Sequence, residues 1–175
     1  MRRGPDRSDE VTVDRIAQIE RAFAGVPRGL IGLREANALD DRLDETDPAA
    51  LVAFRLADIE TDWRKIPEKI LLANPSVFSF LDDAGLKFVI PAVFTWFYKN
   101  PNASSEVPEF LYYSLLPTTR RSREAKTLIS ELKFTPDQTR VIFTWLQDMI
   151  AAGKVRPSAF DLTQLAKWEH AVAQL

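Results

Sequence analysis

The sequence predicts a mainly α, single-domain fold with a small β-hairpin near its centre. Apolar residues recur every three or four positions along most of the chain, which is typical of amphipathic helices. Proline follows a capping residue at Asp47-Pro48 and at Thr135-Pro136, which indicates two helix starts. Residues 77–90 instead alternate apolar and polar side chains, and this pattern predicts strands.

The bulk properties restrict the class of protein. A chain of 175 residues favours one domain, which we place at residues 11–175 behind a disordered tail at 1–10. The net charge of −2 gives no general attraction to nucleic acid or anionic lipid. The chain has no cysteine, no signal-like apolar N-terminus and no apolar run of membrane-spanning length. We therefore expect a cytoplasmic protein with no membrane or nucleic-acid partner and no cofactor.

Three helices are predicted in the first third of the chain, at residues 13–23, 33–43 and 48–60. Each has apolar residues at helical spacing and charged residues between them. In the third helix, Leu51 and Phe54 are expected to face the core.

The central stretch has two interpretations. Two alternating runs flank residues 82–85, and Gly85 would supply the positive φ that a hairpin turn needs. The competing interpretation is one helix that runs from Asp83 through Pro91. An interior proline costs about 3 kcal/mol, so we favour the hairpin, followed by a helix with Pro91 at its first position.

The last third of the chain is also predicted to be helical. A short helix at 108–116 precedes a weaker and partly basic segment at 118–133. Thr135 and Gln138 have the spacing of a capping box, and a wide apolar face follows them. The final helix is expected to be capped by Asp161.

The central stretch also contains a motif of residues at defined spacing. Its residues are Trp63, Ile66 and Pro67, then Phe80-Leu81-Asp82, then Gly85, Phe88, Pro91 and Ala92. This W-x-x-I-P … F-L-D-x-x-G-x-x-F-x-x-P-A pattern resembles a family of small bacterial domains of unknown function. The resemblance covers roughly residues 30–152 and implies a shared fold without an activity. The family often has an aromatic residue before Pro-Ala, where this chain has Val89-Ile90.

The functional prediction is a non-enzymatic protein-binding or accessory module, because one histidine and no cysteine leave no catalytic triad or multi-histidine metal site. Tryptophan, tyrosine and arginine are favoured at binding hot spots. The candidate partner-binding residues are Trp96, Tyr98, Tyr112, Tyr113, Arg120 and Arg121. The partner would be another protein or a second copy in a homodimer, and core packing is the alternative role for the rings.

A second hypothesis is a carboxylate-based metal-binding protein or hydrolase. Its residues would be Asp82, Asp83 and Glu60, because converging carboxylates can bind Mg²⁺ or Ca²⁺ or act as an acid and a base. Their spacing matches no calcium-binding loop, and helix caps and turns are the simpler role for such residues.

Overall fold

The computed structural model of the protein describes residues 7–116 and 132–175, and every regular element in these two ranges is a helix. The α-helices and the two short 3₁₀-helices (η) are α1 (Arg7–Ala22), α2 (Leu33–Asp40), α3 (Leu43–Thr46), α4 (Pro48–Ala57), η1 (Trp63–Lys65), α5 (Glu68–Leu71), η2 (Pro75–Ser79), α6 (Asp83–Lys99), α7 (Val107–Leu115), α9 (Pro136–Ala151) and α10 (Ala159–Ala173). None of these described helices combines the length and the apolar character needed to cross a lipid bilayer.

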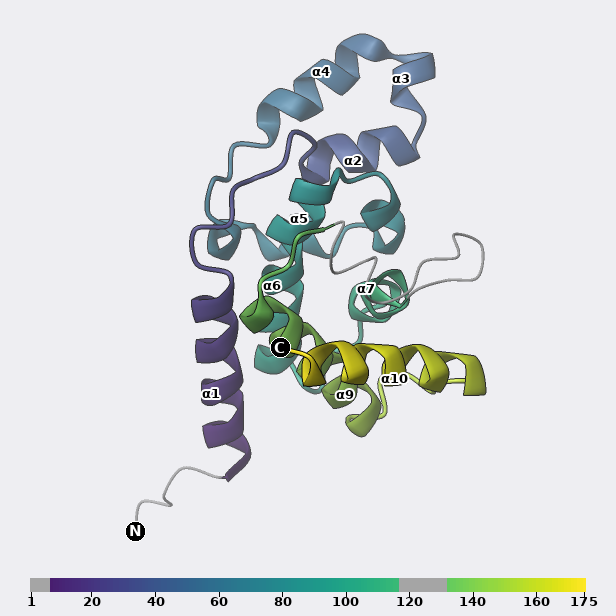
Figure 1. The fold of residues 1–175 in the computed structure, drawn as a ribbon. Coiled ribbons are helices and arrows are strands. Elements are labelled where there is room, and N and C mark those ends of the chain that lie inside the picture. The colour runs from purple at the N-terminus through teal and green to yellow at the C-terminus, as the bar shows by residue number, and fades with distance from the viewer. Residues whose placement is uncertain (1–6, 117–131) are drawn as a thin grey trace.

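Helix α6 lies at the centre of the molecule (Figure 1). Helix α1 runs along one side, and α9 and α10 lie at one end of the fold. Helices α3 and α4 lie at the opposite end, where α4 is packed on α2 and α3. The core forms mainly around α6, α7 and α9, so α4 stands apart from it.

The predicted central β-hairpin is wrong, although the mainly α class is confirmed. Residues 75–79 form η2, and α6 begins at Asp83 and continues through Pro91 without a strand in the described chain. The alternating pattern arose because buried aromatic residues occur on several sides of a helix that lies in the core. Pro91 removes one backbone hydrogen bond, but the burial of Phe94 and Phe97 on the next turns offsets that cost.

Asp82 explains why a helix begins where the sequence suggested a turn. Its Oδ1 accepts a hydrogen bond from the Gly85 N–H at 3.1 Å and so caps α6. Its Oδ2 also accepts from the Leu30 N–H at 3.0 Å. A methyl group on Gly29 would lie 2.2 Å from Asp82 Oδ1, so only glycine fits this close approach.

Two predicted helix starts are confirmed, and a third is wrong. The Asp47 side chain caps α4, with proline at the first position of the helix. Thr135 and Gln138 form the predicted capping box of α9. At α10 the predicted cap is wrong, because Ser158 caps the helix and Asp161 closes the box from the third position.

We predict that Trp63→Ala lowers the free energy of unfolding by about 3–5 kcal/mol. The Trp63 ring is buried in the core, and its Nε1 donates a hydrogen bond to the Phe23 carbonyl oxygen at 3.1 Å. Denaturant unfolding followed by circular dichroism measures the change. Trp63→Phe, which keeps most of the apolar contact, should lose clearly less. Equal stability of Trp63→Ala and the wild type would show that the ring is not part of the core.

Candidate functional site

The predicted aromatic surface is divided between two helices. Trp96 and Tyr98 belong to α6, and Tyr112 and Tyr113 belong to α7. Trp96 is buried, and it lines a hollow of about 210 Å³ together with Trp63. Its indole Nε1 has no hydrogen-bond partner among the described residues. The ring therefore has little surface to offer a macromolecular partner.

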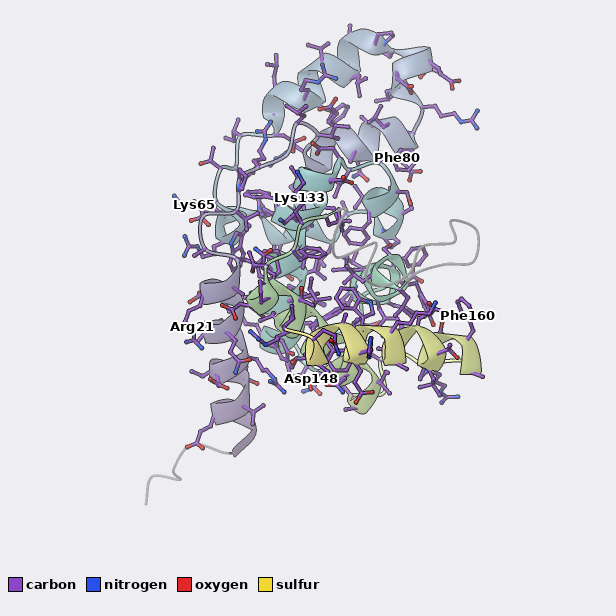
Figure 2. The ribbon with its side chains drawn as sticks, viewed as in Figure 1. Arg21, Lys65, Phe80, Lys133, Asp148 and Phe160 are labelled. Atoms are coloured by element: carbon purple, nitrogen blue, oxygen red, sulfur yellow. The ribbon has the colours of Figure 1, made fainter. Side chains whose placement is uncertain are left out.

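Tyr98 uses its hydroxyl group inside the fold. The Tyr98 Oη donates a hydrogen bond to Asp148 Oδ2 at 2.7 Å. Arg15 Nε lies 2.9 Å from the same oxygen, although it is not aligned for a hydrogen bond. Burial, followed by the hydrogen bond to Asp148, raises the pKa of Tyr98 above its ordinary value. This contact joins α6, α1 and α9, near the Asp148 label in Figure 2.

The two neighbouring tyrosines of α7 have different surroundings. Tyr112 is fully buried, and burial raises the pKa of its hydroxyl group to about 12. Tyr113 is exposed, and its ring centroid lies 5.3 Å from that of Tyr112. Arg120 and Arg121 lie outside the described residues. A partner surface formed by all six residues stays a prediction, and in the described part only Tyr113 among them is exposed.

Two of the three carboxylates of the second hypothesis, Asp82 and Glu60, already have partners in the fold. Asp82 bonds to backbone N–H groups, and Glu60 accepts two hydrogen bonds from the Arg34 guanidinium, at 2.7 and 2.9 Å. Within residues 7–116 and 132–175, no three His, Asp or Glu side chains lie close enough to hold a metal ion. Asp82, Asp83 and Glu60 are therefore not brought together as a metal site.

Helix α4 has the least expected surroundings in the fold. It is ten residues long, Arg55 is its only charged residue, and none of its side chains is buried. An apolar helix is normally covered on its apolar sides. Figure 2 shows the side chains of α4 projecting from the edge of the molecule, with no other element above them.

The exposed apolar side chains of α4 follow a regular spacing. Val52 is 49% exposed and Leu56 73% exposed, and Ala49 precedes them by three residues. Ile59 lies two residues beyond the helix, where the backbone is no longer helical, and is also 73% exposed. Alternation of three and four residues is the spacing of an apolar seam that packs against another helix. We call Ala49, Val52, Leu56 and Ile59 the α4 stripe.

An ion pair helps to hold the inner side of α4. Arg55 Nε donates a hydrogen bond to Glu35 Oε1 at 2.8 Å, and the guanidinium also pairs with this carboxylate through Nη2. Glu35 is almost completely buried. A buried carboxylate without its cation would cost several kcal/mol, so Glu35 fixes the side of α4 that faces α2.

Asp58, the residue directly after α4, fixes the end of the helix. Its two oxygens accept hydrogen bonds from the Arg34 and Glu35 N–H groups, at 3.0 and 2.9 Å. These are the second and third amides of α2, in the first turn, where a carboxylate is favoured by the helix dipole. A methyl group on Gly32 would lie 2.4 Å from Asp58 Cγ, so glycine makes room for the contact.

Acidic residues surround the other end of α4. Residues 41–47 contain four acidic side chains and one arginine, a formal charge of −3, and all five are exposed. The Asp47 Oδ1 caps α4 through the Ala50 N–H at 3.0 Å. The α4 stripe is thus an apolar strip with acidic residues at one end.

The sequence expectation for α4 was partly wrong. Phe54, which was expected in the core, is 41% exposed, and Leu51 is half-buried. The apolar residues were assigned inward because amphipathic helices usually have one apolar side. A signal was available in the composition: apolar residues occur all round α4, so no single inward side could have covered them.

In its described residues the protein is all helical. One apolar helix, α4, is exposed to solvent and is held to α2 by the Arg55–Glu35 pair and by Asp58. The chain belongs to a family described as "Family of unknown function (DUF6714)", whose model matches residues 11–172. The predicted membership of a family of unknown function is therefore confirmed, and the match is longer than the expected range of 30–152. The motif pattern itself stays a prediction. No curated protein and no solved structure matches the chain.

We predict that Asp58→Ala lowers the free energy of unfolding by about 3 kcal/mol, because two charge-assisted hydrogen bonds at a buried helix end are lost. Asp58→Asn keeps one accepting oxygen and should lose about half as much. Urea unfolding of both variants measures the difference. Wild-type stability in Asp58→Ala would show that the contact with α2 does not hold this end of α4.

We also predict a loss of stability in acid that depends on Glu60. Hydrogen bonds from Arg34 hold the pKa of Glu60 below its ordinary value. A carboxylate with a lowered pKa stabilises the fold above its unfolded pKa of about 4.3, and this stabilisation disappears as the pH falls through the folded pKa. Wild type should therefore exceed Glu60→Gln in stability at pH 6, and the gap should close below about pH 4. A gap that is constant from pH 3 to pH 7 would contradict this assignment.

Proposed function

We propose that this protein is a non-enzymatic binding module that docks the α4 stripe against an α-helix of a second protein chain. The observation that carries the proposal is that α4 has no buried side chain while its only charged residue, Arg55, pairs toward the body of the protein. The ions face inward and the apolar side chains face the solvent. That arrangement is unfavourable in a free monomer and becomes favourable when a partner covers the helix.

The energy of docking supports this role. Burying an aliphatic side chain gains about 1.5–3 kcal/mol relative to leaving it exposed. Val52 and Leu56 on α4, with Ile59 behind them, are each about half exposed or more. A partner helix that covers all three gains several kcal/mol before the cost of association is subtracted. The partner must present its own apolar seam, since three-and-four spacing packs best against the same spacing.

The carboxylate hypothesis has less support, because Asp82 and Glu60 are occupied by backbone and arginine partners. The cysteine-free sequence favours a cytoplasmic setting for the binding module.

A labelled model peptide tests the proposal. The peptide is amphipathic, with leucines at the seam positions and balanced charges elsewhere, and fluorescence anisotropy measures its binding. We predict that Leu56→Glu weakens binding at least about tenfold, or ~1.4 kcal/mol, because a charge replaces an apolar contact in the interface. The stability of this variant should stay close to that of the wild type, since Leu56 is exposed.

Leu162→Glu is the matched control. Leu162 is an exposed leucine on α10, at the far end of the fold from α4. It carries the same change of residue type and charge, so the peptide should bind this variant as it binds the wild type. Equal weakening in both variants, or no peptide binding by the wild type, would overturn the assignment of α4 as a docking surface.

A further inference from the structure

A hollow of about 300 Å³ opens beside the start of α6. Its walls come from three segments that are far apart in the sequence: the one after α1, the first two turns of α6, and the one that leads into α9. Four aliphatic residues line it, namely Val26, Pro27, Ala84 and Leu132. No aromatic ring of the described residues does so. We call this space the α6 hollow, and its size lies at the lower end of the range of small-molecule sites.

Two lysines share the α6 hollow. Lys87 lies on the second turn of α6, and its Nζ donates a hydrogen bond to the Lys133 carbonyl oxygen at 3.0 Å. The same Nζ lies 5.4 Å from the centre of the Phe134 ring. Lys133, which is labelled in Figure 2, also lines the hollow. An ammonium group has three N–H donors, so the bond to Lys133 leaves Lys87 with two for a ligand.

The charges in the α6 hollow are not balanced. Burial, followed by repulsion from Lys133, lowers the pKa of Lys87 below its ordinary value, and no carboxylate of the described chain counteracts this. The one acid that lines the hollow in the described residues is Asp83, which is exposed. The three charged lining residues therefore have a formal charge of +1. An anion beside the two ammonium groups would offset their mutual repulsion.

We infer that the α6 hollow binds a small organic carboxylate with an aliphatic body. The carboxylate pairs with Lys87 and Lys133, and the aliphatic body covers Ala84 and Leu132. Hydrogen bonds between two charged groups are roughly twice as strong as those between neutral groups. An alkyl chain suits the lining, because the hollow offers no ring on which an aromatic ligand could stack. The hollow shares no residue with the α4 stripe, so neither proposal depends on the other.

Octanoate is the probe that tests the inference. Calorimetric titration of the full chain measures its binding below the concentration at which it forms micelles, and one octanoate should bind per chain. Acetate has the charge without the alkyl chain, and octanol has the chain without the charge. Each should bind at least about tenfold more weakly than octanoate, because each lacks one of the two contacts. Absence of octanoate binding, or octanol binding as tight as that of octanoate, would overturn the inference.

Matched lysine variants locate the site. Lys87→Met keeps the length of the side chain but removes its charge, and it should weaken octanoate binding at least about tenfold. Lys99→Met makes the same change at the exposed last residue of the same helix, outside the hollow, and should bind octanoate as the wild type does. Asp83→Asn removes the repelling carboxylate and should tighten binding about two- to fivefold. Equal octanoate affinity in Lys87→Met and Lys99→Met would place the ligand elsewhere and contradict the inference.

Lys133 separates a binding role from a structural one. Its φ of 50° lies in the left-handed region that favours glycine. Lys133→Gly should therefore unfold at the same temperature as the wild type or a higher one, while its affinity for octanoate falls several-fold. Wild-type octanoate affinity in this stable variant would remove Lys133 from the site and contradict the pairing of the carboxylate with both lysines.

Discussion

The position of α4 depends on the contact between the Asp58 carboxylate and the amides in the first turn of α2. Asp58 is the residue that follows α4, and its side chain bonds to the first turn of α2, a helix that begins 25 residues earlier. The Arg34 guanidinium adds its own bond to Asp58 and continues to Glu60, which extends the ionic support past the helix end. Arg55 pairs with Glu35 on the side that faces α2, while Val52 and Leu56 face the solvent.

A second aspartate, Asp82, binds backbone N–H groups at the other end of the loop before α2. Asp82 caps α6 and also accepts the N–H groups of Leu30 and Ile31. Residues 29–32 are thus held between two aspartates, with Gly29 and Gly32 at the points of closest approach. The loop connects the aromatic core around α6 to the α2–α4 end of the molecule. These carboxylates therefore join the core to the end of the molecule that holds α4.

Local signals in the sequence predicted local structure well. The Asp47 cap and the capping box of Thr135 and Gln138 depend on residues within one turn, and both are present. The hairpin failed because an apolar run in a fully buried helix does not show its helical period clearly. A proline inside a helix does destabilise it, but at Pro91 the burial of the α6 aromatic residues outweighs that cost.

The candidate site could be predicted only in part, because its support is formed by residues far apart in the chain. Nothing near Asp58 indicates that it bonds to Arg34 and Glu35, and nothing near Arg55 indicates a buried Glu35. Two of the aromatic residues predicted to bind a partner have roles inside the fold instead: Tyr112 is buried, and Tyr98 donates a hydrogen bond to Asp148. The one usable signal was the composition of α4, which is too apolar for a solvent-facing helix.

Hydroxyl-radical footprinting of the dilute protein tests the central claim most directly, since it reports which side chains water reaches. Our account predicts that Phe54 and Leu56 of α4 are modified as readily as exposed Leu162, while core Leu111 is protected. Protection of Phe54 and Leu56 in the dilute monomer would contradict the account, because α4 would then pack its apolar side against its own chain.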